Sequence, residues 1–151
     1  MRINIYSIKQ VRESCVTYKG IEEAKISNPM DVADLVNHLF DLASADRESF
    51  GILCLNAKNK INGAHIVSVG SLNGSIAHPR EVFKLAILNN AAGIILFHNH
   101  PSGDTTPSPE DKAVTHKMIE AGRLLDIKVL DHIIIGHDGR FTSLANEGYM
   151  K

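Results

Sequence analysis

The 151-residue chain has only two cysteines, Cys15 and Cys54, and no Cys-x-x-Cys pair. This scarcity argues against a disulfide framework and against a zinc site built on thiolates, and it favours a reducing compartment, for which the cytoplasm is the default. The chain also lacks any apolar stretch near the ~20 residues that a membrane span needs, and residues 1–6 lack the apolar core of a signal peptide. We therefore expect a cytoplasmic protein without a membrane anchor.

An excess of charge of either sign is missing too, because 16 Lys and Arg stand against 17 Asp and Glu, which gives a formal net charge of -1. Bulk attraction to nucleic acid or to an anionic membrane is therefore absent, and direct nucleic-acid binding would need a local basic patch. The 44% of hydrophobic residues and 22% of charged residues are typical of a globular protein. The length predicts one domain over residues 1–151.

Patterns typical of strands and of helices alternate along the chain. We expect a strand or hairpin over residues 3–18, strands over residues 50–55, 61–69, 93–97 and 127–135, and helices over residues 29–43, 79–90 and 109–125. Asn28-Pro29 and Ser108-Pro109 each place a cap residue and a proline in the order that begins a helix. Asn73-Gly74 and Asp138-Gly139 are typical of turns. The alternation predicts an α/β fold with one sheet that has antiparallel pieces.

The most informative pattern is the pair His98 and His100, which follows the predicted strand 93–97. Because successive strand side chains alternate between the two faces, imidazoles two positions apart project from the same side and can share a metal. Asp111 follows in the first turn of a predicted helix, after a loop whose prolines and glycine can fold the chain back to the strand end. Three protein ligands are typical of catalytic zinc, which leaves a fourth position to a water whose pKa the ion lowers to about 7.

Such a water needs a base, and the candidate is Glu48, which comes just before the predicted strand 50–55. A carboxylate at the mouth of a strand can take the proton of the water and later hand it to a leaving amine. Taken from spacing alone, a solvated acid beside Arg47 is the favoured interpretation of this residue.

The segment 98–111, His-Asn-His-Pro-Ser-Gly-Asp-Thr-Thr-Pro-Ser-Pro-Glu-Asp, resembles the JAMM (JAB/MPN) metalloprotease motif: His-x-His, seven residues, Ser, two residues, Asp. Its first six residues are similar to the bacterial RadC-like branch, as are residues 47–50, 79–82 and 130–136. The resemblance covers about residues 46 to 145. It implies a cytidine-deaminase-like α/β/α sandwich with a mixed, partly antiparallel sheet, made of an N-terminal strand plus helix (1–45) and a zinc-binding core (46–151).

The resemblance also implies roles for single residues. His98, His100 and Asp111 would bind Zn²⁺, Glu48 would be the catalytic base, and Ser108 would stabilise the tetrahedral oxyanion. Longer members of the branch carry a helix-hairpin-helix region before the core, and residues 1–45 are too few and wrongly patterned for it. We therefore expect no such region, and no DNA contact from it.

Two residues have a structural interpretation beside the functional one. Ser108 is a helix N-cap in its own right, worth ~1 kcal/mol to the helix, and the two roles can coexist or compete. His132 on the predicted strand 127–135 can orient a metal-bound histidine, but a core or edge histidine with satisfied hydrogen bonds is the favoured interpretation. The remaining histidines show no ligand spacing and are expected on the surface or in loops: His38, His65, His78, His116 and His137.

Two functions follow from these patterns. The leading one is a zinc-dependent hydrolase of peptide or isopeptide bonds, with water activated between zinc and Glu48. The alternative, suggested by the RadC-like name, is a DNA-repair or mobile-element accessory protein whose zinc domain binds rather than cleaves. A zinc base deaminase needs His-x-Glu and Pro-Cys-x-x-Cys, which the sequence lacks. The contiguous letters His-Asn-His are also unlike the nuclease signature of that name, which is spread over tens of residues.

Overall fold

The structure of the chain, a computed structural model, describes residues 1–7, 10–70 and 77–151. Its elements are α1 (Pro29–Phe40), β1 (Ser49–Leu55), β2 (Ile61–Val69), α2 (Pro79–Leu88), β3 (Gly93–Asn99), α3 (Pro109–Leu125), β4 (Lys128–Ile135) and β5 (Phe141–Ser143), with short 3-10 turns η1 (Glu22–Ala24) and η2 (Leu42–Ser44) on either side of α1. β5 is the strand that sequence analysis does not predict. None of the helices in the described residues is long and apolar enough to cross a membrane.

The strands form one sheet in the order β2-β1-β3-β4-β5. β1 is antiparallel to both β2 and β3, β3 is parallel to β4, and β4 is antiparallel to β5. This confirms the predicted mixed, partly antiparallel sheet. β3 lies at the centre and all its residues are buried, which explains why its sequence is a continuous apolar run rather than an alternating one.

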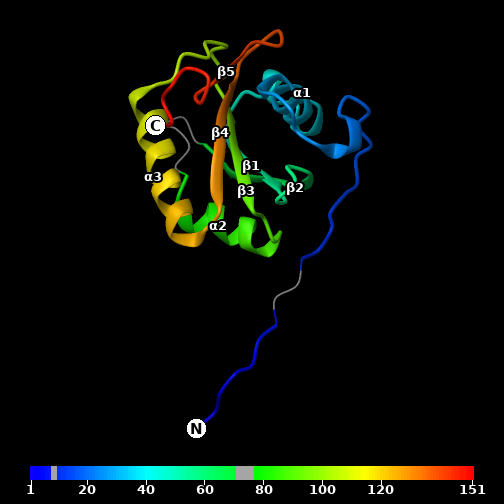
Figure 1. Cartoon of the computed structure of the whole chain (residues 1–151), viewed down its shortest axis with the longest axis vertical. Coiled ribbons are helices and arrows are strands. Elements are labelled where there is room, and N and C mark those ends of the chain that lie inside the picture. Colours follow the sequence, from blue (N-terminus) through cyan, green and yellow to red (C-terminus); the bar gives the residue numbers. More distant parts are fainter. Residues whose placement is uncertain (8–9, 71–76) are drawn as a thin grey trace.

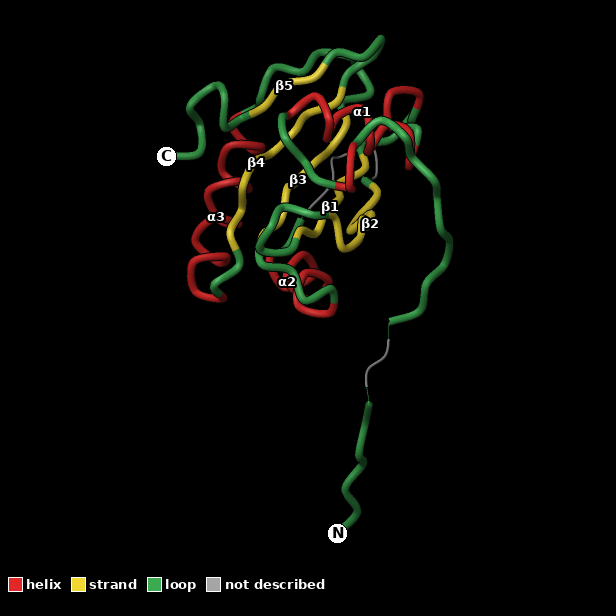
Figure 2. The backbone as a smooth tube through the Cα atoms, turned by 45° about the vertical axis from the view of Figure 1, so that its right-hand side comes forward, coloured by secondary structure: helices red, strands yellow, loops and turns green. Residues whose placement is uncertain are grey.

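Helices cover both faces of the sheet, with α1 on one side and α2 and α3 on the other (Figure 1; Figure 2). Alternate residues of β1 and β3 face opposite layers. Four of these side chains pack on the α1 side of the sheet: Leu53, Leu55, Ile95 and Phe97. Four others pack on the side of α2 and α3: Ile52, Cys54, Ile94 and Leu96. The result is the three-layer α/β/α arrangement expected from the sequence. His98 continues the second set, so it faces α3.

The predicted start of the first helix is confirmed. The Asn28 side chain accepts a hydrogen bond from the N–H of Asp31 at 3.0 Å, and the Asp31 carboxylate accepts from the N–H of Asn28 at 3.2 Å, which forms a capping box. The helix ends at Phe40 rather than residue 43, because Asp41 adopts a left-handed φ of 51°.

The strand or hairpin predicted over residues 3–18 is wrong for the described part of that segment. Residues 1–7 and 10–19 form neither helix nor strand; residues 1–7 extend away from the domain (Figure 1; Figure 2), whereas Tyr18 packs against the core on the α1 side, with its ring centroid 5.0 Å from that of His38. Ile3, Ile5 and Val11 are 74%, 96% and 84% exposed. β-branched residues stabilise a strand only when a partner strand and a packed face are present, and these side chains have no such cover.

The turn predicted at Asp138-Gly139 is confirmed. Both residues have positive φ values, 55° and 74°, and the N–H of Arg140 donates to the carbonyl oxygen of His137 at 3.0 Å. The turn predicted at Asn73-Gly74 lies outside the described residues.

The thiol of Cys54 tests the packing of the sheet against α2 and α3. Cys54 on β1 is 0% exposed, and burial raises the pKa of its thiol to about 12. Because the thiolate is the reactive form, a maleimide at neutral pH should modify the exposed Cys15 alone in the native protein and both cysteines after unfolding. Mass spectrometry counts the labels. The control is Cys15→Ser, which should take no label while folded; rapid native labelling of this variant would contradict the packing.

Candidate metal centre

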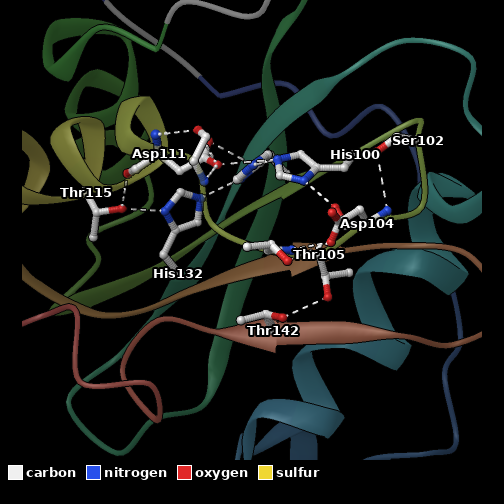
Figure 3. A network of polar contacts seen from close by, with 11 residues as sticks. His100, Ser102, Asp104, Thr105, Asp111, Thr115, His132 and Thr142 are labelled. Carbon is white, nitrogen blue, oxygen red and sulfur yellow. Dashed lines mark hydrogen bonds and ion pairs between the residues drawn. The ribbon is translucent and has the colours of Figure 1, made fainter.

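The carboxyl end of β3 brings His98 and His100 to the side of the sheet that α3 covers. His98 is buried and stacks on the ring of Phe50, its partner on β1, with ring centroids 6.2 Å apart. His100 follows the last residue of the strand, and its Nδ1 lies 2.6 Å from the carbonyl oxygen of Asp104. A carbonyl oxygen can only accept, so Nδ1 of His100 carries a proton and its Nε2 is the atom turned toward Asp111 (Figure 3).

The start of α3 fixes Asp111. The Ser108 N–H and hydroxyl donate to Oδ2 of Asp111 at 2.8 and 2.7 Å, and the Asp111 N–H donates back to the Ser108 hydroxyl oxygen at 3.1 Å. This is a capping box, so the N-cap interpretation of Ser108 is confirmed. The box holds the carboxylate on the side of the helix start that faces the two histidines.

The loop between His100 and α3 is tied down at several points. Gly103 has a φ of 79°, and a Cβ at this position would lie 2.6 Å from Nδ1 of His137, so both conformation and space require glycine. The Thr142 hydroxyl of β5 donates to Thr105 at 2.8 Å (Figure 3). These contacts bring the helix start back to the strand end, as the loop composition predicts.

The three predicted ligand residues converge. Nε2 of His98 lies 2.9 Å from Nε2 of His100 and 3.1 Å from Oδ1 of Asp111, and Nε2 of His100 lies 3.4 Å from Oδ2 of Asp111. Ligand atoms ~2.05 Å from a tetrahedral zinc ion lie about 3.3 Å apart, so these donors fit zinc with small adjustments. Among the described residues, this is the one group of three or more His, Cys, Asp or Glu side chains close enough to share a metal.

The charges of the cluster suit a metal. Burial alone would raise the pKa of Asp111, but hydrogen bonds with His100 and His98 hold it well below its usual range, so the group is a carboxylate. The hydrogen bond with Asp111 raises the pKa of His100. A metal ion would replace this attraction, because metal binding requires neutral imidazoles and an ionised carboxylate.

Glu48 lies close to the cluster at the start of β1. Antiparallel pairing of Phe50 with His98 places the beginning of β1 beside the end of β3, and the negative charge of Glu48 contributes to the raised pKa of His100, after the larger effect of Asp111. The structure therefore brings the predicted base and the predicted ligands to one place. The Glu48 side chain is partly exposed, so water can reach it.

The side chain of Asn99 forms hydrogen bonds with the backbone of the residues before and after Glu48, and sequence analysis does not predict these contacts. Its side-chain N–H donates to the carbonyl oxygen of Arg47 at 3.0 Å, and its side-chain oxygen accepts from the N–H of Ser49 at 2.7 Å. Asn99, the last residue of β3, is buried, and it binds the backbone of the residues on both sides of Glu48. An amide side chain at the end of an apolar central strand was the available signal.

His132 on β4 is buried, as the favoured interpretation states, but it also contacts a predicted ligand. Its Nε2 lies 2.7 Å from Nδ1 of His98, and its Nδ1 lies 2.6 Å from the hydroxyl of Thr115 on α3 (Figure 3). Burial lowers the pKa of His132 well below its usual value, so this imidazole is neutral. Thr115 is absent from the sequence prediction; its place one helical turn after Asp111 was the signal.

The mixed sheet between two helix layers, with two histidines and an aspartate converging at the end of its central strand, defines an α/β domain with a candidate metal centre. A family model described as the RadC-like JAB domain matches residues 26–149, and the chain belongs to this family. The family match confirms the resemblance found in the sequence.

Relatives of the chain are UPF0758 proteins. It is 60% identical over 125 residues to one from Moorella thermoacetica, which covers 83% of this chain and 53% of that protein. It is 46% identical over 147 residues to one from Methanosarcina barkeri, with 97% and 63% covered, and 52% identical over 128 residues to one from Caldanaerobacter subterraneus, with 85% and 54% covered. The chain thus spans between 53% and 63% of the length of these relatives.

Proposed function

We propose that this chain is a zinc-dependent hydrolase of peptide or isopeptide bonds that works in the cytoplasm. The observation that carries the proposal is the convergence of His98, His100 and Asp111 on one point. Membership of the RadC-like JAB family supports it. Zinc, when bound by these residues, supplies Lewis acidity and lowers the pKa of a water molecule to near 7.

One side of the cluster is open to a substrate. The side chains of His100 and Asp111 are 17% and 13% exposed, whereas that of His98 is 1% exposed. His98 therefore closes the inner side of the cluster, and a carbonyl group approaches from the side of His100 and Asp111. A peptide substrate fits this arrangement because its amide can reach the centre from solvent.

Glu48 moves the proton that amide hydrolysis requires. The attacking water loses one proton to the Glu48 carboxylate while its oxygen bonds to the amide carbon. The carbon–nitrogen bond then breaks, and Glu48 passes the proton to the leaving nitrogen. The products are a carboxylic acid and an amine, and Glu48 returns to its ionised form.

Ser108 stabilises the negative charge that forms on the carbonyl oxygen. Its hydroxyl donates to Oδ2 of Asp111 at 2.7 Å in the structure, so it has to turn from the carboxylate to the substrate oxygen during the reaction. A donor placed at a developing oxyanion is typically worth ~10²–10³ in kcat.

Ser108→Ala should therefore lower kcat by about 10²–10³-fold and leave the zinc content unchanged. Loss of the N-cap should also lower the free energy of unfolding by about 1 kcal/mol. The matched control is Asn28→Ala, which removes the cap of the other capping box, on α1. If both variants lose the same stability and both retain full turnover, Ser108 is a cap alone.

The proposal is tested with the zinc-loaded chain on two libraries, one of linear peptides and one of peptides joined through a lysine side chain, with cleavage measured by mass spectrometry. Cleavage that a chelator abolishes and zinc restores supports the hydrolase. Affinity for duplex and single-stranded DNA is measured in parallel against salt concentration. Salt-dependent micromolar binding without any cleavage would overturn the hydrolase and support the accessory role.

A further inference from the structure

We propose that Thr115, acting through His132, is a positioning residue that favours the form of His98 able to bind a metal. This inference rests on the proposed function, because it concerns the same metal centre. A histidine can offer Nε2 to a metal only when its remaining ring proton is on Nδ1. For His100 the backbone carbonyl of Asp104 ensures this form. His98 instead faces the ring of His132, which can be either a donor or an acceptor.

Thr115 resolves that ambiguity. Its hydroxyl oxygen lies 2.6 Å from the carbonyl oxygen of Asp111, and two oxygens this close need a proton between them. The carbonyl has no proton, so Thr115 donates. A hydroxyl has only one proton, and therefore toward Nδ1 of His132, also 2.6 Å away, the Thr115 oxygen can only accept.

The assignment of donor and acceptor at Thr115 then determines donor and acceptor in the next two hydrogen bonds, those of His132 and His98. Nδ1 of His132 carries the proton that Thr115 accepts. His132 is 1% exposed and its ring nitrogens face a hydroxyl and another imidazole, so the ring stays neutral and its Nε2 has a lone pair. Nδ1 of His98, 2.7 Å away, must therefore donate, which leaves Nε2 of His98 free on the side of His100 and Asp111.

A second contact, between Asp111 and His98, disfavours the proton on Nδ1 of His98 when no metal is bound. Oδ1 of Asp111 lies 3.1 Å from Nε2 of His98 and attracts a proton to that nitrogen. If the proton moves there, His98 must accept from His132, and Nδ1 of His132 then has to accept from Thr115. The short contact between Thr115 and the Asp111 carbonyl opposes this reversal. The beginning of α3 thus provides Asp111 as one proposed ligand and, through Thr115, determines which ring nitrogen of His98 carries the proton.

The test is zinc affinity, measured by competition with a chromogenic chelator, for Thr115→Val and Thr115→Ser. Valine has the shape of threonine but cannot accept from His132, so zinc binding should leave a buried N–H unpaired and weaken about 10–100-fold. Serine keeps the hydroxyl and should bind zinc as the wild type does. Thr17→Val, the same change on an exposed side chain of the N-terminal segment, should leave the affinity unchanged.

Nitrogen-15 NMR of the zinc-loaded wild type gives a readout that needs no variant: His132 should carry its ring proton on Nδ1. A proton on Nε2 of His132, or equal zinc affinity of wild type and Thr115→Val, would overturn the inference and leave the proposed hydrolase standing. A folded wild type that binds no zinc would overturn the proposed function itself.

Discussion

Asp111→Ala is expected to lose zinc. Structural zinc sites with four protein ligands have apparent binding free energies of ~10–16 kcal/mol, so one ligand contributes roughly 3 kcal/mol, equivalent to about 100-fold in affinity. The wild type, purified without chelator and without added metal, should contain about one zinc per chain by elemental analysis, and the variant should contain almost none. The two remaining histidines are too few to retain the ion through purification.

A matched control separates the ligand role of Asp111 from its structural role. Asp31 occupies the same position in the capping box of α1, where its carboxylate accepts from the N–H groups of Ser27 and Asn28. Asp31→Ala should lower the free energy of unfolding by about 1 kcal/mol, as expected for a lost capping interaction, and should keep its zinc. An Asp111→Ala protein that is folded and still holds one zinc per chain would contradict the three-ligand site.

Glu48→Gln should slow hydrolysis strongly without loss of metal. Glutamine keeps the size of the side chain but cannot accept and return a proton, and such catalysis is typically worth ~10²–10⁴-fold in rate. We expect kcat to fall by that factor on any substrate that the wild type cleaves. Zinc content and thermal stability should match those of the wild type, because Glu48 is not among the ligands.

The control for this variant is Asp46→Asn, which makes the same change of charge two residues earlier on an exposed side chain. It should leave turnover unchanged. If both variants lose activity to the same extent, the effect comes from the local charge and not from a proton carried by Glu48. Full activity of Glu48→Gln would overturn its role as the base.

The convergence of the three candidate ligands could be predicted because its signals are local. The spacing of His98 and His100 follows from the two-residue period of a strand, and Asp111 follows from the capping pattern of a helix start. Most helices and strands could be predicted for the same reason, because apolar periodicity is a property of short segments, whereas the three-layer arrangement was implied by the family resemblance. The error over residues 3–18 has the converse cause: β-branched residues there satisfy a local pattern that no partner strand completes.

The contacts around the ligands could not be predicted in the same way, because they join distant positions. Asn99 and Ser49 are 50 positions apart, His132 and His98 are 34 apart, and Thr115 and His132 are 17 apart. Each pair meets only after the register of the sheet and the docking of α3 are established. The segment around His132 resembles the family, but its hydrogen-bond partners are properties of the folded chain.

The two hydrogen bonds from Asn99 to the neighbours of Glu48 have a consequence for how the centre is assembled. Neighbouring strands lie ~4.8 Å apart, and the side chain of Asn99 on β3 forms hydrogen bonds with the backbone of Arg47 and Ser49 across this distance. The spacing between Glu48, the proposed base, and His98 is therefore set when β1 and β3 pair. If Glu48 is the base, substrate binding does not have to supply the free energy that orders its backbone, because strand pairing and Asn99 already do so.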